Sequence, residues 1–270
     1  MTAEIEDLVR AERRGAVLLL TLNRPERLNA WTDALEWRYY ELLDGAEADR
    51  EVRAIVVTGA GRGFCAGADM QDLQGAATGA VDTERPERER PRFYPMTVRK
   101  PLIAAINGAA VGLGLVEALY CDLRFCTPQA KLSTVFARRG LVAEYGVSWI
   151  LTRLVGPSTA LDLLLSGRTV LGEEAHRLRL VDRLSEPERV VEDAVAYAQE
   201  LATYSSPWSM AAMKAQVLAD SVRDFDASFH AAQQLMVESF RRADVEEGVR
   251  SFMERREPAF AGLEPRGAQS

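Results

Sequence analysis

The segment 101–122 constrains the fold more than any other part of the sequence. Its apolar run 102–106 has the pattern of a buried strand, and Asn107-Gly108 predicts a turn. Gly112-Leu113-Gly114 then opens an apolar helical stretch. The first N–H groups of a helix have no partner inside it, and the helix dipole favours negative charge there. The pattern is therefore typical of a site for a phosphate, a carboxylate or a developing oxyanion, although a tight turn in a buried core would have the same pattern.

A second glycine-rich stretch favours the ligand site. Residues 61–69 are Gly-Arg-Gly-Phe-Cys-Ala-Gly-Ala-Asp and follow a predicted strand at Ala54–Thr58. Loops of small residues that follow two strands can face each other and direct two backbone N–H groups at one oxygen atom. We therefore expect the segments 61–69 and 107–114 to form one site.

These two stretches, together with Leu-Asn-Arg-Pro-Glu-Arg-Leu-Asn-Ala at 22–30, resemble the crotonase (enoyl-CoA hydratase/isomerase) superfamily. The resemblance runs from about Ala16 to Phe260 and keeps the motifs in order. It implies an α/β fold, a spiral of ββα units, followed by a C-terminal all-α region that builds a homotrimer or a hexamer. We expect the spiral core at 1–200 and the helical oligomerisation region at 201–270.

Periodicity alone predicts an α/β region followed by helices. Residues 4–10 and 16–22 have the pattern of a hairpin, and Thr32 or Asp33 can cap a helix that presents Leu35 and Tyr39 on one face. Further strands are expected at 123–126 and 181–184, and helices at 147–155, 158–165 and 173–180. From Pro187 onward the pattern is helical, with helices expected at 188–202, 208–219, 225–241 and 244–256.

Composition narrows the class of protein. The chain has 270 residues, 47% hydrophobic and 27% charged, with a net charge of −7, which argues against a protein that coats nucleic acid. We expect no membrane span and no signal peptide, and therefore a cytoplasmic protein. Cys65, Cys121 and Cys126 lack a metal-ligand pattern and are predicted to be buried thiols.

The resemblance assigns the binding residues. It implies that the N–H groups of Ala68 and Leu113 bind a thioester carbonyl oxygen; Leu113 replaces the usual glycine of the family. Coenzyme A, as part of an acyl-CoA substrate, is expected along the set Arg27, Leu28, Ala30, Ala66, Asp69 and Met70. Arg27 could equally be a surface guanidinium. Phe252 and the pair Arg255-Arg256 are weaker candidates for holding the nucleotide. No separate cofactor and no metal are expected.

The acid/base residues depart from those of the hydratases. Alignment on the family motifs places Val116 and Phe136 where hydratases carry two glutamates. Glu117 is one helical step away from the first of these positions. Its side chain would reach the site as a second catalytic candidate only if the helix were shifted, and it is otherwise expected to be a surface or subunit-contact charge. Glu144, just before a predicted helix, resembles the single catalytic carboxylate of some delta-3, delta-2 enoyl-CoA isomerases. We therefore expect Glu144 to be the base.

Double-bond isomerisation of an enoyl-CoA thioester is thus the predicted reaction, because one carboxylate suffices for it. Hydration, decarboxylation and carbon–carbon bond cleavage remain alternatives within the family. The loss of both hydratase glutamates also leaves open a non-catalytic acyl-CoA-binding scaffold.

The remaining candidates are predicted to have structural roles. The charged run 84–92 is expected to be a solvated loop, and the neighbouring residues 93–96 to line an acyl pocket. His176 and His230 have no serine or cysteine partner in sequence and are expected at the surface. The tryptophans are expected to be core or interface aromatics, namely Trp31, Trp37, Trp149 and Trp208.

Overall fold

The computed structural model describes residues 5–78 and 90–267. Within them, a six-stranded sheet has the order β1-β2-β3-β5-β7-β10, and a four-stranded sheet has the order β4-β6-β8-β9. The first sheet contains β1 (Val9–Arg14), β2 (Val17–Leu22), β3 (Ala54–Gly59), β5 (Leu102–Ile106), β7 (Leu123–Cys126) and β10 (Arg183–Leu184). The second contains β4 (Gly63–Cys65), β6 (Ala109–Val111), β8 (Lys131–Ser133) and β9 (Val170–Leu171).

Successive strands alternate between the two sheets. The chain passes from β3 to β4, from β5 to β6 and from β7 to β8, and each strand pairs in parallel with its counterpart in the next turn. Helix α3 (Met70–Ala77) follows the first of these pairs, and α5 (Leu113–Tyr120) follows the second. The chain therefore winds as a spiral of ββα units, as predicted.

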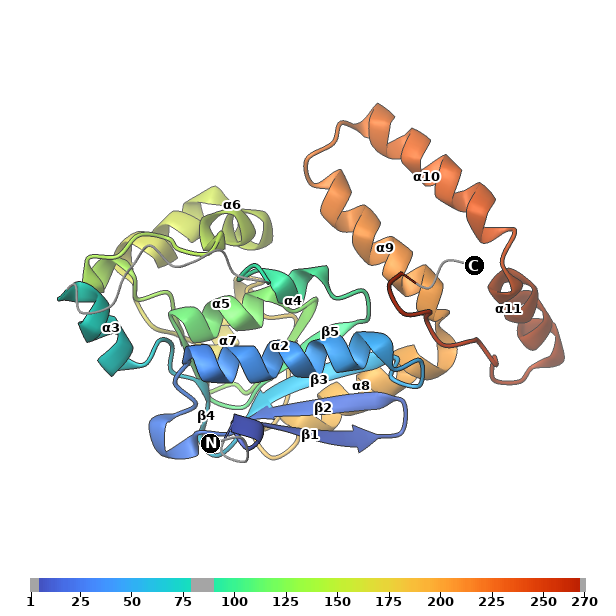
Figure 1. Ribbon diagram of the computed structural model, residues 1–270. Helices are drawn as coiled ribbons and strands as arrows, with labels where there is room; N and C mark the ends of the chain where they lie inside the picture. The colour runs from blue at the N-terminus through green and yellow to red at the C-terminus, as the bar shows by residue number, and fades with distance from the viewer. Residues whose placement is uncertain (1–4, 79–89, 268–270) are drawn as a thin grey trace.

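The large sheet is covered on both faces, which explains its nearly continuous apolar strands. In β3, Ala54 and Val56 pack on α8 (Val190–Tyr204), whereas Ile55 and Val57 face the core that contains α2 (Asp33–Ala48) and α5. Side chains alternate across a strand, so a single strand serves both cores. Figure 1 shows α2 and α8 on opposite faces of this sheet.

Most predicted elements form close to their expected ends. Thr32 caps α2, because its hydroxyl oxygen accepts a hydrogen bond from the Leu35 N–H at 3.2 Å. Helix α6 (Val147–Ser166) spans two predicted helices, and Gly156 lies between them with non-helical backbone angles. Strand β1 begins at Val9, later than expected, and the short strands β6 and β8 were not predicted. The run 84–89 lies outside the described residues.

The other helices and 3-10 turns complete the description. They are η1 (Pro25–Arg27), α4 (Tyr94–Thr97), η2 (Ala137–Arg139), α7 (Gly172–Arg177), α9 (Pro207–Asp220), α10 (Phe225–Ser239) and α11 (Ala243–Glu254). Within the described ranges, no helix combines the length and apolar character needed to cross a membrane.

The helices α9, α10 and α11 stand apart from the α/β body (Figure 1). They expose large apolar side chains: Met213, Val217, Phe225, Phe229, Met236, Val237, Phe240, Val249, Phe252 and Met253. Four of these, Phe225, Phe229, Met236 and Phe240, follow a helical spacing and share one face of α10 and its C-terminal end.

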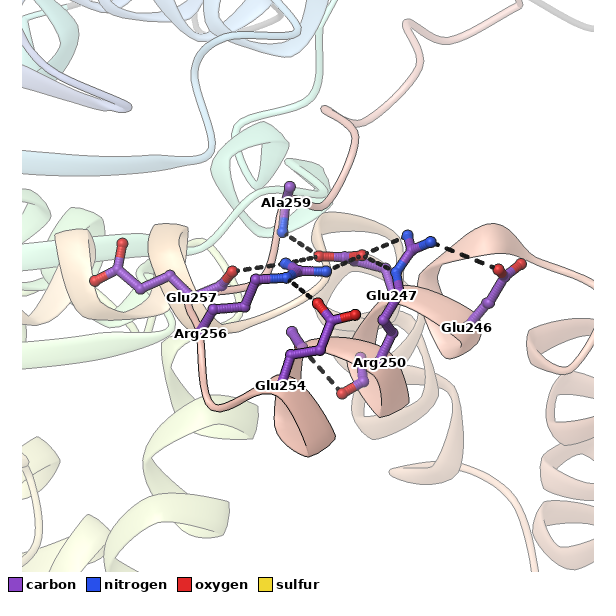
Figure 2. A network of polar contacts seen from close by, with 9 residues as sticks. Glu246, Glu247, Arg250, Glu254, Arg256, Glu257 and Ala259 are labelled. Atoms are coloured by element: carbon purple, nitrogen blue, oxygen red, sulfur yellow. Dashed lines mark hydrogen bonds and ion pairs between the residues drawn. The ribbon is translucent and has the colours of Figure 1, made fainter.

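A carboxylate network ties the end of α11 to the segment that follows it (Figure 2). Glu247 accepts hydrogen bonds from Arg256 Nη1 at 2.6 Å, from the Ala259 N–H at 2.7 Å and from Arg250 Nη2 at 2.8 Å. Arg255 takes a left-handed conformation at the helix end, so the chain reverses there and Phe260 becomes buried. Glu247 thus fixes where the chain leaves α11.

We expect Glu247→Gln to loosen this reversal at neutral pH. The hydrogen bonds from Arg256, Ala259 and Arg250 hold the pKa of Glu247 well below its usual range. A lowered pKa in the folded state contributes stability that is present above the usual carboxyl range and is lost as the pH falls toward the lowered value.

Thermal unfolding and limited proteolysis near residue 256 would measure this effect. The matched control is Glu246→Gln. Glu246 is the neighbouring residue on the same helix, but its contact with Arg250 is longer, at 3.8 Å. Equal melting temperatures for the Glu247 and Glu246 variants at neutral pH would contradict the assignment.

Candidate active site

The start of α5 lies directly against β4. A Cβ atom on Gly114 would lie 2.1 Å from the Cys65 carbonyl oxygen, so no side chain fits there. The preceding Gly112 has φ 53° and ψ −122°, a conformation that glycine adopts most readily. The glycine turn identified in the sequence therefore allows a helix start and a strand end to touch.

Gly67 brings the second loop to the same place. Its φ is 95°, and a Cβ atom there would lie 2.6 Å from the Val111 carbonyl oxygen and 3.6 Å from the Leu113 nitrogen. The residue that follows, Ala68, pairs with Trp31 in an isolated parallel bridge. The predicted meeting of the segments 61–69 and 107–114 is therefore present in the structure.

The backbone N–H groups around this contact differ in their partners. Ala66 donates to Leu28 O at 2.9 Å, Asp69 donates to Trp31 O at 3.0 Å, and Gly112 donates to Ser133 O at 2.8 Å. Among the residues that the structure describes, the N–H groups of Ala68 and Leu113 have no protein acceptor. Two backbone donors thus remain available where the two loops meet.

Asn29 holds the third loop, 24–30, against this contact. Its side chain accepts from the Arg24 N–H at 2.8 Å and donates to Ala60 O at 3.0 Å and Gly63 O at 2.8 Å. Asn29 is fully buried and has a φ of 56°, a left-handed conformation that asparagine tolerates better than most residues. The sequence analysis did not single out Asn29; an Asn in a loop of this composition is a weak signal by itself.

The expected coenzyme A residues lie along these loops. Arg27 is exposed, and Met70 is exposed at the start of α3. Leu28 has a left-handed backbone conformation, and its carbonyl oxygen accepts the hydrogen bond from the Ala66 N–H. Ala30 is buried beside Trp31. The hydrogen bonds from Ala66 to Leu28 and from Asp69 to Trp31 therefore bring the loops that carry this set together.

Asp69 already has an internal partner. Its carboxylate pairs with Arg24 Nη2 at 3.1 Å and accepts from the Gln71 N–H at 3.1 Å. Partial burial alone would raise the pKa of Asp69, but the Gln71 N–H and the Arg24 guanidinium together hold that pKa below its usual value. The Asp69 side chain thus caps α3 and anchors Arg24, a residue that the sequence analysis did not select.

Glu144 lies in the turn before α6 and is half-buried. Burial raises the pKa of its carboxyl, and the positive charge of Arg92 acts in the opposite direction. The adjacent Tyr145 has its carbonyl oxygen 2.7 Å from the Tyr120 hydroxyl, which donates to it from the end of α5. The turn that carries Glu144 is therefore tied to the helix that begins at Leu113.

Val116 and Phe136, which we expect at the positions of the two hydratase glutamates, are both buried apolar side chains. The burial of Glu117 differs from what the sequence predicted. Glu117 is 3% exposed rather than a surface or subunit-contact charge, because every residue of α5 is buried. Both of its carboxyl oxygens lack a hydrogen-bond partner within the described residues. Burial, reinforced by the negative charge of Glu36, raises the pKa of Glu117 well above its usual range and so favours the neutral acid.

Other candidates have structural positions. Cys65, Cys121 and Cys126 are buried free thiols, as predicted, and burial raises the pKa of Cys65 to about 12. His176 and His230 lie at the surface. Trp31 is buried, whereas Trp37 is 52% exposed. In the described part of the chain, no group of three or more histidine, cysteine or acidic side chains is arranged to hold a metal ion.

Comparison with known proteins agrees with this geometry. The sequence profile of the family described as Enoyl-CoA hydratase/isomerase matches residues 12–263. A relative named 1,2-epoxyphenylacetyl-CoA isomerase, from Escherichia coli (strain K12), is 34% identical over 252 residues, which span 91% of this chain and 95% of the relative. The chain therefore belongs to the enoyl-CoA hydratase/isomerase family.

Solved structures show the same fold. The enoyl-CoA hydratase from Mycobacterium tuberculosis H37Rv superposes with a TM-score of 0.87 at 29% identity, over 95% of this chain and 100% of that chain. The enoyl-CoA hydratase EchA12_1 from Mycobacterium marinum is 49% identical, with a TM-score of 0.69 over 80% of this chain and 100% of that chain. The crotonase-like fold is therefore confirmed. Because relatives are named as both isomerases and hydratases, family membership establishes the class and not the reaction.

Glu117→Gln should change how stability depends on pH. An unfolded glutamate has a pKa of about 4.3, whereas burial holds that of Glu117 well above it. Between these two values the unfolded chain releases a proton that the folded chain keeps. The free energy of unfolding of the wild type therefore falls by about 1.4 kcal/mol per pH unit on account of this group.

The variant lacks this loss, so it should gain stability relative to the wild type as the pH rises above the usual carboxyl range. Urea unfolding at several pH values measures the difference. Glu188→Gln makes the same change at an exposed position and should show no such trend. A difference between Glu117→Gln and the wild type that is independent of pH would mean that Glu117 is ionised in the folded protein.

Proposed function

We propose that this protein isomerises the double bond of an enoyl-CoA thioester, with Ala68 and Leu113 supplying the oxyanion hole and Glu144 acting as the base. One observation carries the proposal: two N–H groups that have no acceptor within residues 5–78 and 90–267 lie at the contact made by Gly67, while a half-buried carboxylate lies on a turn that is hydrogen-bonded to α5. This combination provides an anion site and a proton acceptor on connected elements.

The chemistry needs both parts. Glu144 takes a proton from C2 of a 3-enoyl thioester, and the electron pair moves through the thioester carbonyl to give a dienolate. The two N–H groups stabilise the negative oxygen, and one such donor is typically worth about 3 kcal/mol of barrier or more. Return of the proton to C4 completes the isomerisation without a second acid or base.

The environment of Glu144 suits a base that must also return its proton. Burial raises the pKa of its carboxyl, which brings it toward the working pH, and Arg92 limits the rise. Glu117 is the acidic side chain within α5, but its oxygens are enclosed. We therefore assign Glu117 no proton-transfer role.

Coenzyme A would lie along the loops that carry Arg27, Leu28 and Ala66, with Asp69 stabilising this surface through Arg24. Ala30 and Met70 flank the same loops. The acyl group would extend toward 93–96, where Pro95 is buried and Phe93 is exposed. Coenzyme A enters as part of the substrate, so no separate cofactor is required.

Hydration is the alternative that the names of the solved relatives favour. It would use Glu144 alone to activate water, because Val116 and Phe136 provide no acid or base. Decarboxylation, carbon–carbon bond cleavage and non-catalytic binding of acyl-CoA remain distinguishable from isomerisation by their products.

We further propose that 201–270 forms an oligomerisation region on the spiral core of 1–200, in a homotrimer or hexamer. The apolar face of α10 at Phe225, Phe229 and Met236 supports this, because these side chains are exposed in the single chain.

Glu144→Gln should abolish isomerisation with little change in binding. We expect kcat on trans-3-hexenoyl-CoA to fall by at least about 100-fold, since the amide cannot accept the C2 proton. The assay follows the 2-enoyl product and deuterium at C2 and C4 by NMR in deuterated water. Glu188→Gln, at an exposed position, is the control for the charge change.

Wild-type turnover by Glu144→Gln would remove Glu144 from the mechanism. A 3-hydroxyacyl product from a 2-enoyl thioester at a higher rate than isomerisation would favour the hydratase alternative. Binding without exchange or conversion across a panel of acyl-CoA thioesters would favour the scaffold.

The oligomer proposal is tested by Phe229→Glu. Sedimentation velocity should show three or six chains for the wild type, and dissociation for the variant, because a charge would be buried in an apolar contact. Gln234→Glu, on another face of α10, should retain the assembly. A monomeric wild type would contradict the proposal.

A further inference from the structure

Arg92 is held in the protein interior, although it ends a charged run that was expected to be solvated. Its side chain is 13% exposed, and Nη1 lies 2.5 Å from Oε2 of the buried Glu36. Its carbonyl oxygen accepts a hydrogen bond from the Tyr40 hydroxyl at 2.7 Å. Both the backbone and the side chain of Arg92 are therefore anchored to α2.

From Glu36, a series of hydrogen bonds leads through Trp31 to the residues on either side of Ala68, whose N–H group is one of the two proposed donors. Oε2 of Glu36 accepts from the Trp31 indole N–H at 3.1 Å. The Trp31 backbone donates to Gly67 O at 2.8 Å and accepts from the Asp69 N–H at 3.0 Å. These two bonds flank Ala68, so they set the position of its free N–H group.

On its other side, Arg92 reaches the helix of the second donor. Its guanidinium carbon lies 5.1 Å from the centroid of the Tyr145 ring, a cation–π distance. The Tyr145 carbonyl oxygen accepts a hydrogen bond from the hydroxyl of Tyr120, the last residue of the helix that begins at Leu113. A continuous chain of contacts from Ala68 to the Leu113 helix therefore passes through Arg92 and the turn that carries Glu144.

Arg92 also places a positive charge beside several acidic groups. Its charge opposes the effect of burial on the pKa of both Glu144 and Glu117. The charged and titratable groups around it come from each element packed there: Asp33, Glu36 and Tyr40 on α2, Glu117 and Tyr120 on α5, and Glu144 and Tyr145 in the turn.

Resting on the proposed function, we propose that Arg92 is a positioning residue that fixes the Glu144 turn relative to the two N–H donors and holds a positive charge beside the Glu144 carboxylate. It does not touch the reacting atoms. Two edges of its guanidinium are directed at Glu36 and Asp33, and its face lies over Tyr145.

Arg92→Met should separate the two effects. Loss of the positive charge disfavours the Glu144 anion, so the acid limb of the pH profile of kcat/KM should shift to higher pH by about one pH unit or more. Loss of the anchor should lower kcat by about tenfold even on the alkaline plateau, with KM changed less than about twofold. Arg92→Lys keeps the charge but not the planar contacts, so it should restore the acid limb while kcat stays low.

Arg90→Met is the matched control. Arg90 lies two residues away, pairs with Asp44 and stacks over Tyr94 at 5.9 Å. This variant should keep the wild-type pH profile. An unchanged acid limb in Arg92→Met, or an equal shift in Arg90→Met, would overturn the proposal.

A second readout is independent of turnover. Infrared difference spectra of the wild type minus Glu144→Gln isolate the Glu144 carboxyl band, and a pH titration of that band gives its pKa directly. We expect this pKa to rise in Arg92→Met and to return in Arg92→Lys. If the wild type turns over no enoyl-CoA, the proposed function fails, yet this titration still decides whether Arg92 sets the charge of Glu144.

Discussion

The contact between the end of β4 and the start of α5 is the constraint on which the site depends. Gly114 lies against the Cys65 carbonyl, and Gly67 lies against the Val111 carbonyl, at distances that leave no space for a Cβ atom. Because both approaches are made by backbone, the geometry is set by the spiral itself. This geometry explains why the N–H groups of Ala68 and Leu113 have no acceptor among the described residues. Trp31 forms its backbone hydrogen bonds with the Gly67 carbonyl and the Asp69 N–H, on either side of Ala68, and Leu113 is the first residue of a helix.

Around this backbone frame, burial sets the charge of each acid. Glu117 is enclosed and has no hydrogen-bond partner among the residues that the structure describes, which favours its neutral form, whereas Glu144 is half-buried and has Arg92 nearby. Helix α5 thus carries a donor of the proposed oxyanion hole at its start. At its end, the Tyr120 hydroxyl donates a hydrogen bond to the turn that carries the proposed base, Glu144.

Much of this fold was predictable from sequence, because glycine turns, apolar strands and helix periodicity are local patterns. Ala68 and Leu113 were selected through the family resemblance, and the predicted meeting of the two segments that carry them is present in the structure. The surroundings of Glu117 and Arg92 were not predicted, since both depend on contacts between segments far apart in the chain: α2, the residues before α4 and α5. Asn29 was missed for the same reason, because its partners Ala60 and Gly63 belong to another loop.

The central claim is that Ala68 and Leu113 together polarise a thioester carbonyl. Infrared spectroscopy of a bound, non-reacting acyl-CoA with a 13C-labelled thioester carbonyl tests it most directly. Two backbone donors withdraw electron density from the carbonyl oxygen, so its stretching band should move to lower frequency on binding than in water. A bound carbonyl whose band stays at or above its frequency in water would contradict the account, because the oxygen would then lie outside the space between the two N–H groups.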